Sequence, residues 1–220
     1  MKEPHPRVTA IAFDCGGVLF SNAWNDEGED ASFNVIHQRL GIAKRRGDEI
    51  FLRHWPKIRV GSEREDVFFL DLISVAKNRM RLSELKALYR SCIIKKDAFE
   101  IVEKLRTSHP DVLLFTLNDE GKEWMDARIE KFGLRKYFSG FITSGYVGCA
   151  KTDGKQIYKI FLERTRVHAT ECIFIDNKRK LLIPARALGF NTVLFKNARL
   201  LEEELKRQGI DLSKKEGNRT

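Results

Sequence analysis

Two aspartates in this sequence each follow directly after a short run of apolar residues. Asp14 follows residues 8–13 and is itself followed by Cys15 and two glycines, and Asp176 follows residues 172–175. An unbroken apolar run indicates a strand that is buried on both faces of a parallel sheet. Open sheets of this kind bind ligands at the carboxyl ends of their strands. A carboxylate such as that of Asp14 could act there as a nucleophile, as a metal ligand or as a buried structural acid.

Other polar residues close the remaining apolar runs. Thr116 and Asn118 lie at the end of the run 112–117, and Lys151 follows the short run 141–144. Parallel strands bring their carboxyl ends to one edge, so we expect these groups to converge with Asp14 and Asp176. Two acids suit a hard cation such as Mg²⁺, and a hydroxyl, an amide and an ammonium suit a phosphate. Lys151 alone is more typical of a surface lysine, so the prediction depends on the combination.

The strands that must position these groups alternate with helices from about residue 97 onward. This alternation predicts an α/β fold with a doubly wound, flavodoxin-like parallel sheet. Residues 21–96 contain helical patterns and no second strand, which predicts a small helical cap inserted into the α/β core of residues 1–20 and 97–220. Within that segment we expect one helix over 48–55, interrupted by Pro56.

Composition narrows the class of protein. The chain has 220 residues, 42% of them hydrophobic and 32% charged, with a formal net charge of +9. Excess positive charge favours anionic partners, but the basic residues are scattered and nucleic acid is not an expected partner. No apolar run approaches the roughly 18 residues of a membrane span. The four cysteines are widely spaced, as in a reduced cytoplasmic protein. The sequence does not predict the oligomeric state.

Taken together, the motifs resemble those of the haloacid dehalogenase (HAD)-like hydrolase superfamily, in particular its members with a helical cap after the first strand. The resemblance spans residues 7–197. It is carried by residues 13–19 (Phe-Asp-Cys-Gly-Gly-Val-Leu), 116–120 (Thr-Leu-Asn-Asp-Glu), 144–151 (Ser-Gly-Tyr-Val-Gly-Cys-Ala-Lys), 174–177 (Phe-Ile-Asp-Asn) and 185–189 (Ala-Arg-Ala-Leu-Gly).

The resemblance implies a Mg²⁺-dependent phosphatase of a small phosphomonoester. In this reading Asp14 attacks phosphorus and forms an aspartyl-phosphate that water then hydrolyses. The Asp14 carboxylate, the Gly16 carbonyl and Asp176 would hold Mg²⁺. Thr116 and Lys151 would neutralise the phosphoryl oxygens, with help from the side chain of Asn118.

The sequence also departs from the superfamily pattern. The second aspartate usual two residues after the nucleophile, a general acid and base, is replaced by Gly16, and Asn177 replaces a usual acid. The first change would slow turnover and the second would weaken metal binding or its outer-shell support, while the triplet at 178–180 could attract an anionic substrate or be ordinary surface. Two alternatives therefore stay open: a weak or inactive relative with a binding or regulatory role, and carbon–halogen hydrolysis. The second acid argues against the latter, which needs no metal.

Residues of the cap are candidates for selecting the substrate, although apolar residues at helical spacing are more often core. These candidates, none of which we assign, are Trp24, Phe33, His54, Trp55, Phe68 and Phe69. His37 or His54 could replace the missing general acid, but a lone histidine on a helix is more often structural.

Overall fold

The computed structural model describes residues 7–21, 33–90 and 92–213. Within these residues five parallel strands form one sheet in the order β3-β2-β1-β4-β5. The strands are β1 (Ala10–Phe13), β2 (Leu113–Asn118), β3 (Gly140–Thr143), β4 (Cys172–Asp176) and β5 (Asn191–Leu194). The chain thus starts in the middle of the sheet and builds outward in both directions, as predicted for a doubly wound fold.

Alternating residues of β1 pack into two separate apolar clusters. Ala10 and Ala12 face one cluster, Ile11 and Phe13 face the other, and all four are fully buried. A strand covered on both faces needs apolar side chains at every position. This explains why the sequence before Asp14 is continuously apolar.

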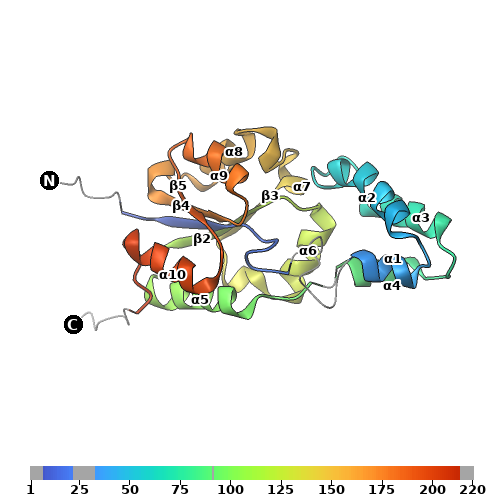
Figure 1. Cartoon of the computed structure of the whole chain (residues 1–220). Coiled ribbons are helices and arrows are strands. Elements are labelled where there is room, and N and C mark those ends of the chain that lie inside the picture. The colour runs from blue at the N-terminus through green and yellow to red at the C-terminus, as the bar shows by residue number, and fades with distance from the viewer. Residues whose placement is uncertain (1–6, 22–32, 91, 214–220) are drawn as a thin grey trace.

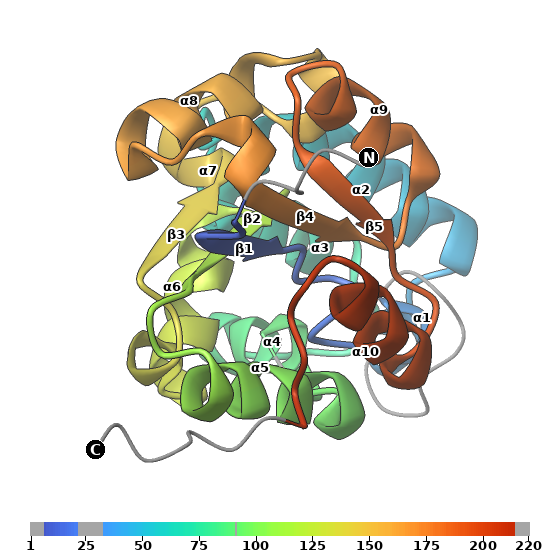
Figure 2. The ribbon, with the colours of Figure 1, turned by 90° about the vertical axis from the view of Figure 1, so that its left-hand side faces the viewer.

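Helices cover both faces of the sheet (Figures 1 and 2). One face carries α8 (Gln156–Thr165) and α9 (Arg179–Arg186), most of whose buried side chains belong to the cluster with Ala10. The other carries α5 (Lys96–Ser108), α6 (Lys122–Lys131) and α10 (Ala198–Arg207). Short helices connect these elements: α7 (Ser144–Val147), η1 (Leu134–Lys136), η2 (Lys151–Asp153) and η3 (Ala169–Glu171).

Four further helices form what we call the helical unit, which lies beside the sheet at its carboxyl edge (Figure 1). Within the described residues its helices are α1 (Phe33–Arg39), α2 (Lys44–Ile58), α3 (Glu65–Val75) and α4 (Leu82–Tyr89). Their buried side chains form a third apolar cluster, which also includes Trp124 of α6. The rings of Trp55 and Trp124 stack with centroids 5.6 Å apart, so the unit packs directly on the α/β core.

The prediction that Pro56 interrupts the second helix is wrong. Helix α2 begins at Lys44, passes through Pro56 and ends at Ile58, and the N–H of Arg59 donates to the carbonyl of Trp55 at 2.9 Å. Proline removes one helical hydrogen bond, to the carbonyl four residues earlier. That carbonyl belongs to Leu52, whose residue surface is 63% exposed, so water can replace the missing donor.

Among the described residues, no helix is both long and apolar enough to span a bilayer. All four cysteines are free thiols.

Candidate active site

The centre of the site is the side chain of Lys151, which bridges two aspartates from neighbouring strands. Its Nζ donates to Asp14 Oδ1 at 2.8 Å and to Asp176 Oδ2 at 2.6 Å. The side chains of Lys151 and Asp176 are fully buried, and that of Asp14 is nearly so. Strands β1 and β4 pair in register up to Phe13 and Ile175, so both carboxylates leave the sheet at the same edge.

Lys151 is held in place from several sides. Its backbone N–H donates to Asp119 Oδ1 at 2.8 Å, in the loop after β2. Its ammonium lies 5.5 Å from the centre of the Phe174 ring. The short helix η2 that carries Lys151 follows α7, so the lysine enters from β3 while its partners lie on β1, β2 and β4. The ammonium is therefore fixed by residues at the ends of β1 and β4, and the backbone of Lys151 by the loop after β2.

The loop after β1 requires one of its two glycines. Gly17 has a φ of 80°, and a Cβ there would clash with the side-chain amide of Asn177. Gly16 does not adopt a left-handed φ, and a Cβ there would meet no atom within 4 Å. Gly17 thus allows the loops after β1 and β4 to touch, whereas Gly16 borders open space.

Burial and charge alter the protonation of this cluster. Burial raises the pKa of Asp14 to about 7, although Lys151 opposes the shift. Burial alone would lower the pKa of Lys151, but the carboxylates of Asp14 and Asp176 outweigh it and hold the pKa above its ordinary value. Burial also raises the pKa of Asp119, again opposed by Lys151. Lys151 is thus a fixed positive charge.

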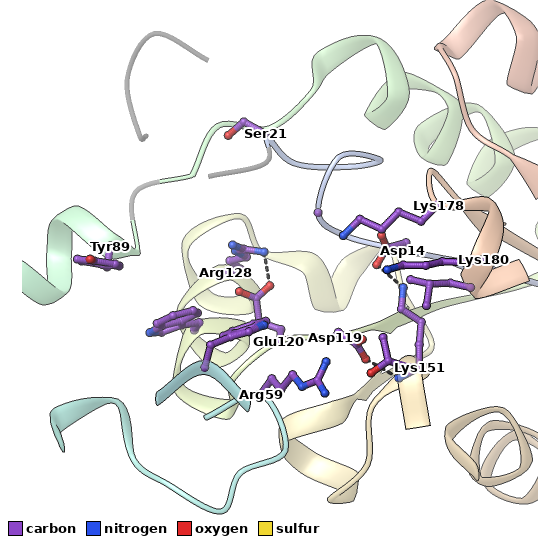
Figure 3. Close-up of a pocket in the computed structure, with 15 residues that line it drawn as sticks. Asp14, Ser21, Arg59, Tyr89, Asp119, Glu120, Arg128, Lys151, Lys178 and Lys180 are labelled. Atoms are coloured by element: carbon purple, nitrogen blue, oxygen red, sulfur yellow. Dashed lines mark hydrogen bonds and ion pairs between the residues drawn. The ribbon is translucent and has the colours of Figure 1, made fainter. Parts of the chain in front are cut away.

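A pocket of about 290 Å³ opens above Asp14 and Lys151 (Figure 3). The helical unit contributes Trp55, Arg59 and Tyr89 to its lining, and the remaining residues come from the α/β core. The lining also contains a buried ion pair between Glu120 and Arg128. The pocket therefore lies between the two parts of the molecule and is lined by both.

The structure does not bring Thr116 to this pocket. Strand β2 continues to Asn118, so Thr116 lies inside the strand, in register with Phe13, rather than at its end. The side chain is fully buried, and its Oγ1 has no hydrogen-bond partner in the described part of the chain. The expected contact between Thr116 and a bound phosphate is not supported.

Asn118 is also turned away from the pocket. Its Oδ1 accepts a hydrogen bond from Thr143 Oγ1 at 3.0 Å, and its Nδ2 lies 3.7 Å from the sulfur of Met125. These contacts tie β2 to β3 and α6 below the edge of the sheet. A role for Asn118 in binding phosphate is likewise not supported.

The candidates in the helical segment fall into different places. Trp55 lines the pocket, whereas Phe68 and Phe69 are buried in the apolar cluster of the helical unit. His54 hydrogen-bonds Glu63 and Asp71 within that unit. His37 is buried against the hydroxyl of Tyr89. Trp24 and the side chain of Phe33 lie outside the described residues.

The residues at the pocket floor fit a divalent cation. The buried carboxylates of Asp14 and Asp176 share one ammonium, that of Lys151, and the half-buried carboxylate of Asp119 accepts a hydrogen bond from the backbone N–H of the same residue, which leaves net negative charge beside the lysine. Hard cations prefer such carboxylate and carbonyl oxygens. In addition, Asn177 Oδ1, next to Asp176, is buried without a partner among the described residues. In that part of the chain, no three His, Cys, Asp or Glu side chains form a ready-made metal cage, so a backbone carbonyl such as that of Gly16 would have to contribute.

Several residues that line the pocket carried no distinctive signal in the sequence. Asp119 and Glu120 follow a strand, but adjacent acids are common on surfaces. Arg59 lies just beyond a helix that the proline was expected to end earlier. The basic triplet at 178–180 is compatible with a surface patch as well as with an anion site, and the structure places Lys178 and Lys180 in the lining.

The order of the strands and the site at their carboxyl edge define an α/β protein of the doubly wound class. Residues 8–189 match the haloacid dehalogenase-like hydrolase family, to which the chain belongs. Among curated proteins it is similar to bifunctional epoxide hydrolase 2 of Sus scrofa, with 36% identity over 80 residues. That match covers 36% of this chain and 14% of the relative.

Solved structures share the fold at low sequence identity. An HAD family enzyme from Bacteroides thetaiotaomicron, in complex with magnesium and inorganic phosphate, has a TM-score of 0.69 and 19% identity, covering 86% of this chain and 95% of that one. A HAD-like family hydrolase from Porphyromonas gingivalis has a TM-score of 0.68 and 19% identity, covering 92% and 98%. L-2-haloacid dehalogenase from Xanthobacter autotrophicus has a TM-score of 0.59 and 18% identity, covering 92% and 84%.

Proposed function

We propose that this hydrolase is a Mg²⁺-dependent phosphatase that removes the phosphoryl group of a small phosphomonoester through an aspartyl-phosphate on Asp14. The observation that carries the proposal is the bridge from Lys151 to Asp14 and Asp176 at the pocket floor. Phosphoryl transfer depends on positioning and on neutralising charge more than on elaborate covalent chemistry. A fixed ammonium between two carboxylates at one end of a small pocket serves both needs.

In the proposed mechanism the Asp14 carboxylate attacks phosphorus in line with the departing alcohol. Lys151 orients that carboxylate through its 2.8 Å hydrogen bond and offsets negative charge on the phosphoryl oxygens. Mg²⁺, held by Asp14, Asp176 and the Gly16 carbonyl, would supply further charge neutralisation. Water then cleaves the acyl phosphate and restores Asp14. The helical unit would act as a cap that excludes bulk water from the pocket.

One feature favours a second function. Gly16 offers no proton to the leaving alcohol, and general acid catalysis contributes about 10²- to 10⁴-fold in rate. A protein without that proton donor either hydrolyses its substrate slowly or serves as a binding protein that retains the pocket without catalysis. Substrates with good leaving groups, which need no proton, separate these two functions.

The test is hydrolysis of an aryl phosphate with and without Mg²⁺. We expect metal-dependent release of phosphate that Asp14→Asn abolishes. Asp111→Asn, a matched change at an exposed carboxylate, should leave the rate unchanged. A folded protein that releases no phosphate from a broad panel of phosphomonoesters would favour the binding function. Halide release from 2-chloropropionate without metal would instead identify a dehalogenase.

A further inference from the structure

The pocket contains more positive charge than its own carboxylates neutralise. Its lining includes five cationic side chains: Arg59, Arg128, Lys151, Lys178 and Lys180. Three carboxylates share the lining, those of Asp14, Asp119 and Glu120, and Asp176 lies directly behind Lys151. Asp153, the ion-pair partner of Arg59, brings the carboxylates in and directly behind the lining to five. These five carboxylates balance the five cations, so a bound divalent cation would leave two positive charges to attract an anion.

Two of the five cations are already held in close, buried ion pairs, and a third, Arg59, makes a longer ion pair with Asp153. Lys151 bridges Asp14 and Asp176, and Arg128 forms the buried ion pair with Glu120 in the lining. The ammonium groups of Lys178 and Lys180 make no ion pair within the described residues, and both lysines lie on the side of the pocket near Asp14 (Figure 3). These two lysines are therefore placed to attract the phosphoryl group.

Arg59 lies on the opposite side, where it projects from the end of α2 into the pocket (Figure 3). Its nearest ion-pair partner is Asp153, with Nη2 and Oδ1 3.6 Å apart, too far for a good hydrogen bond. Its Nε is buried and has no hydrogen-bond partner among residues 7–21, 33–90 and 92–213. A buried guanidinium donor without an acceptor is costly, so this side of the pocket is suited to a bound anion.

The helical unit and α6 also give the pocket an aromatic wall. The stacked rings of Trp55 and Trp124 both line the pocket, together with Tyr89. Such a wall suits the carbon skeleton of a ligand rather than a second charge. A ligand with its phosphoryl group at Lys151 would pass its skeleton along these rings, and a distal group would reach Arg59.

We propose that the pocket selects small phosphomonoesters that carry a second anionic group, a carboxylate or a second phosphate, and that Arg59 binds this group. The inference rests on the proposed function for the position of the phosphoryl group. It adds the class of substrate, which neither the fold nor the catalytic residues define.

The test is calorimetric binding of three phosphonates to the whole protein in the presence of Mg²⁺. Their C–P bond resists hydrolysis, so binding is measured whether or not the protein is a phosphatase. Propylphosphonate has one anionic group, 3-phosphonopropionate adds a carboxylate, and propane-1,3-diphosphonate adds a second phosphonate. The better of the two doubly anionic probes should bind at least about tenfold more tightly than propylphosphonate, as expected of a charged hydrogen bond. Tighter binding of 3-phosphonopropionate would identify the second anionic group as a carboxylate, and tighter binding of propane-1,3-diphosphonate would identify it as a phosphate.

Two variants assign the effect to Arg59. Arg59→Gln should remove the tenfold preference and leave the affinity for propylphosphonate unchanged. Arg53→Gln is the control, because Arg53 lies on the same helix but pairs with Asp71 outside the pocket; it should keep the preference. Equal binding of all three probes, binding of none, or an equal loss for all three in Arg59→Gln would overturn the inference. A preserved preference without hydrolysis of any phosphomonoester would refute the phosphatase and retain the anion site.

Discussion

Lys151 donates a hydrogen bond to Asp176 across 2.6 Å, and neither side chain is exposed to solvent. The two residues are 25 positions apart, on different segments of the sheet edge. A buried lysine needs such partners, because an unpaired charge in the protein interior is very costly. The pair therefore contributes to folding as well as to the proposed chemistry.

Replacing Lys151 with methionine should destabilise the fold and abolish hydrolysis together. The substitution leaves the buried carboxylates of Asp14 and Asp176 without their shared partner, at an expected cost of about 3–5 kcal/mol. Urea unfolding measures the loss. Added Mg²⁺ should restore part of the stability, because a cation bound between the carboxylates replaces the missing charge. Lys206→Met, at an exposed lysine, is the control and should change little; equal stability of both variants would refute the account of the bridge.

Gly16→Asp should increase the rate with poor leaving groups. A Cβ at this position meets no atom within 4 Å, so the new carboxyl group can project into the pocket and, in its protonated form, donate a proton to the departing alcohol. We expect a gain within the roughly 10²- to 10⁴-fold range of general acid catalysis for alkyl phosphates, and a small change for aryl phosphates. Steady-state kinetics with both substrates measures the difference.

Gly17→Asp provides the contrast for that experiment. Its left-handed φ and the nearby Asn177 amide leave no room for a side chain, so this variant should lose both stability and activity. If Gly16→Asp gave no gain with alkyl phosphates while remaining folded, the missing proton donor would not be what slows the reaction.

Acid should weaken the helical unit through His37. Burial lowers the pKa of this imidazole below its ordinary value of 6.5, although Asp48 opposes the shift. The unfolded chain then binds this proton more tightly than the folded chain, so the contribution of His37 to the free energy of unfolding falls as the pH drops below about 6.5. The raised pKa of Asp14 acts in the opposite direction over the same range, so the contribution of His37 is measured as the difference between the wild type and His37→Gln in chemical unfolding between pH 5 and 8. An identical slope in the wild type and the His37 variant would contradict the prediction.

Trp55→Ala should weaken substrate binding more than it slows the chemical step. The ring stacks on Trp124 at an interplanar angle of 14° and joins the helical unit to the core over the pocket. Loss of this aromatic pair removes about 0.5–1.5 kcal/mol of the packing that holds the helical unit over the pocket, and a more loosely covered pocket should raise KM several-fold. Leu52→Ala, at an exposed position on the same helix, should leave KM unchanged. A loss confined to kcat would show that Trp55 does not bind the substrate.

The sequence predicted the parallel sheet, and it predicted that Asp14, Lys151 and Asp176 meet at the carboxyl edge of that sheet. The sheet and the two aspartates could be predicted because they depend on local sequence patterns. Continuous apolar runs identify strands buried on two faces, and polar residues that follow them, such as Asp14 and Asp176, must lie at the carboxyl edge. The predicted contact between Thr116 and phosphate is not supported, because β2 extends to Asn118 and keeps Thr116 inside the strand. A strand end that shifts by one or two residues moves a side chain from the pocket into the interior.

Arg59 could not be predicted for a different reason. Its position depends on whether α2 continues through Pro56, and this is decided by how the helix packs and by solvent access to its last turn. The aromatic wall likewise depends on tertiary packing, since Trp55 and Trp124 come from segments far apart in the sequence. Residue type alone gives no information on such contacts.

Trapping of the phosphorylated protein tests the central claim most directly. The protein is mixed with an aryl phosphate and Mg²⁺, quenched in acid and analysed by peptide mass spectrometry. We predict one added phosphoryl group, located on Asp14, dependent on Mg²⁺ and absent from the Asp14→Asn variant. Phosphate release that persists in Asp14→Asn, or a phosphoryl group on a different residue, would contradict the account.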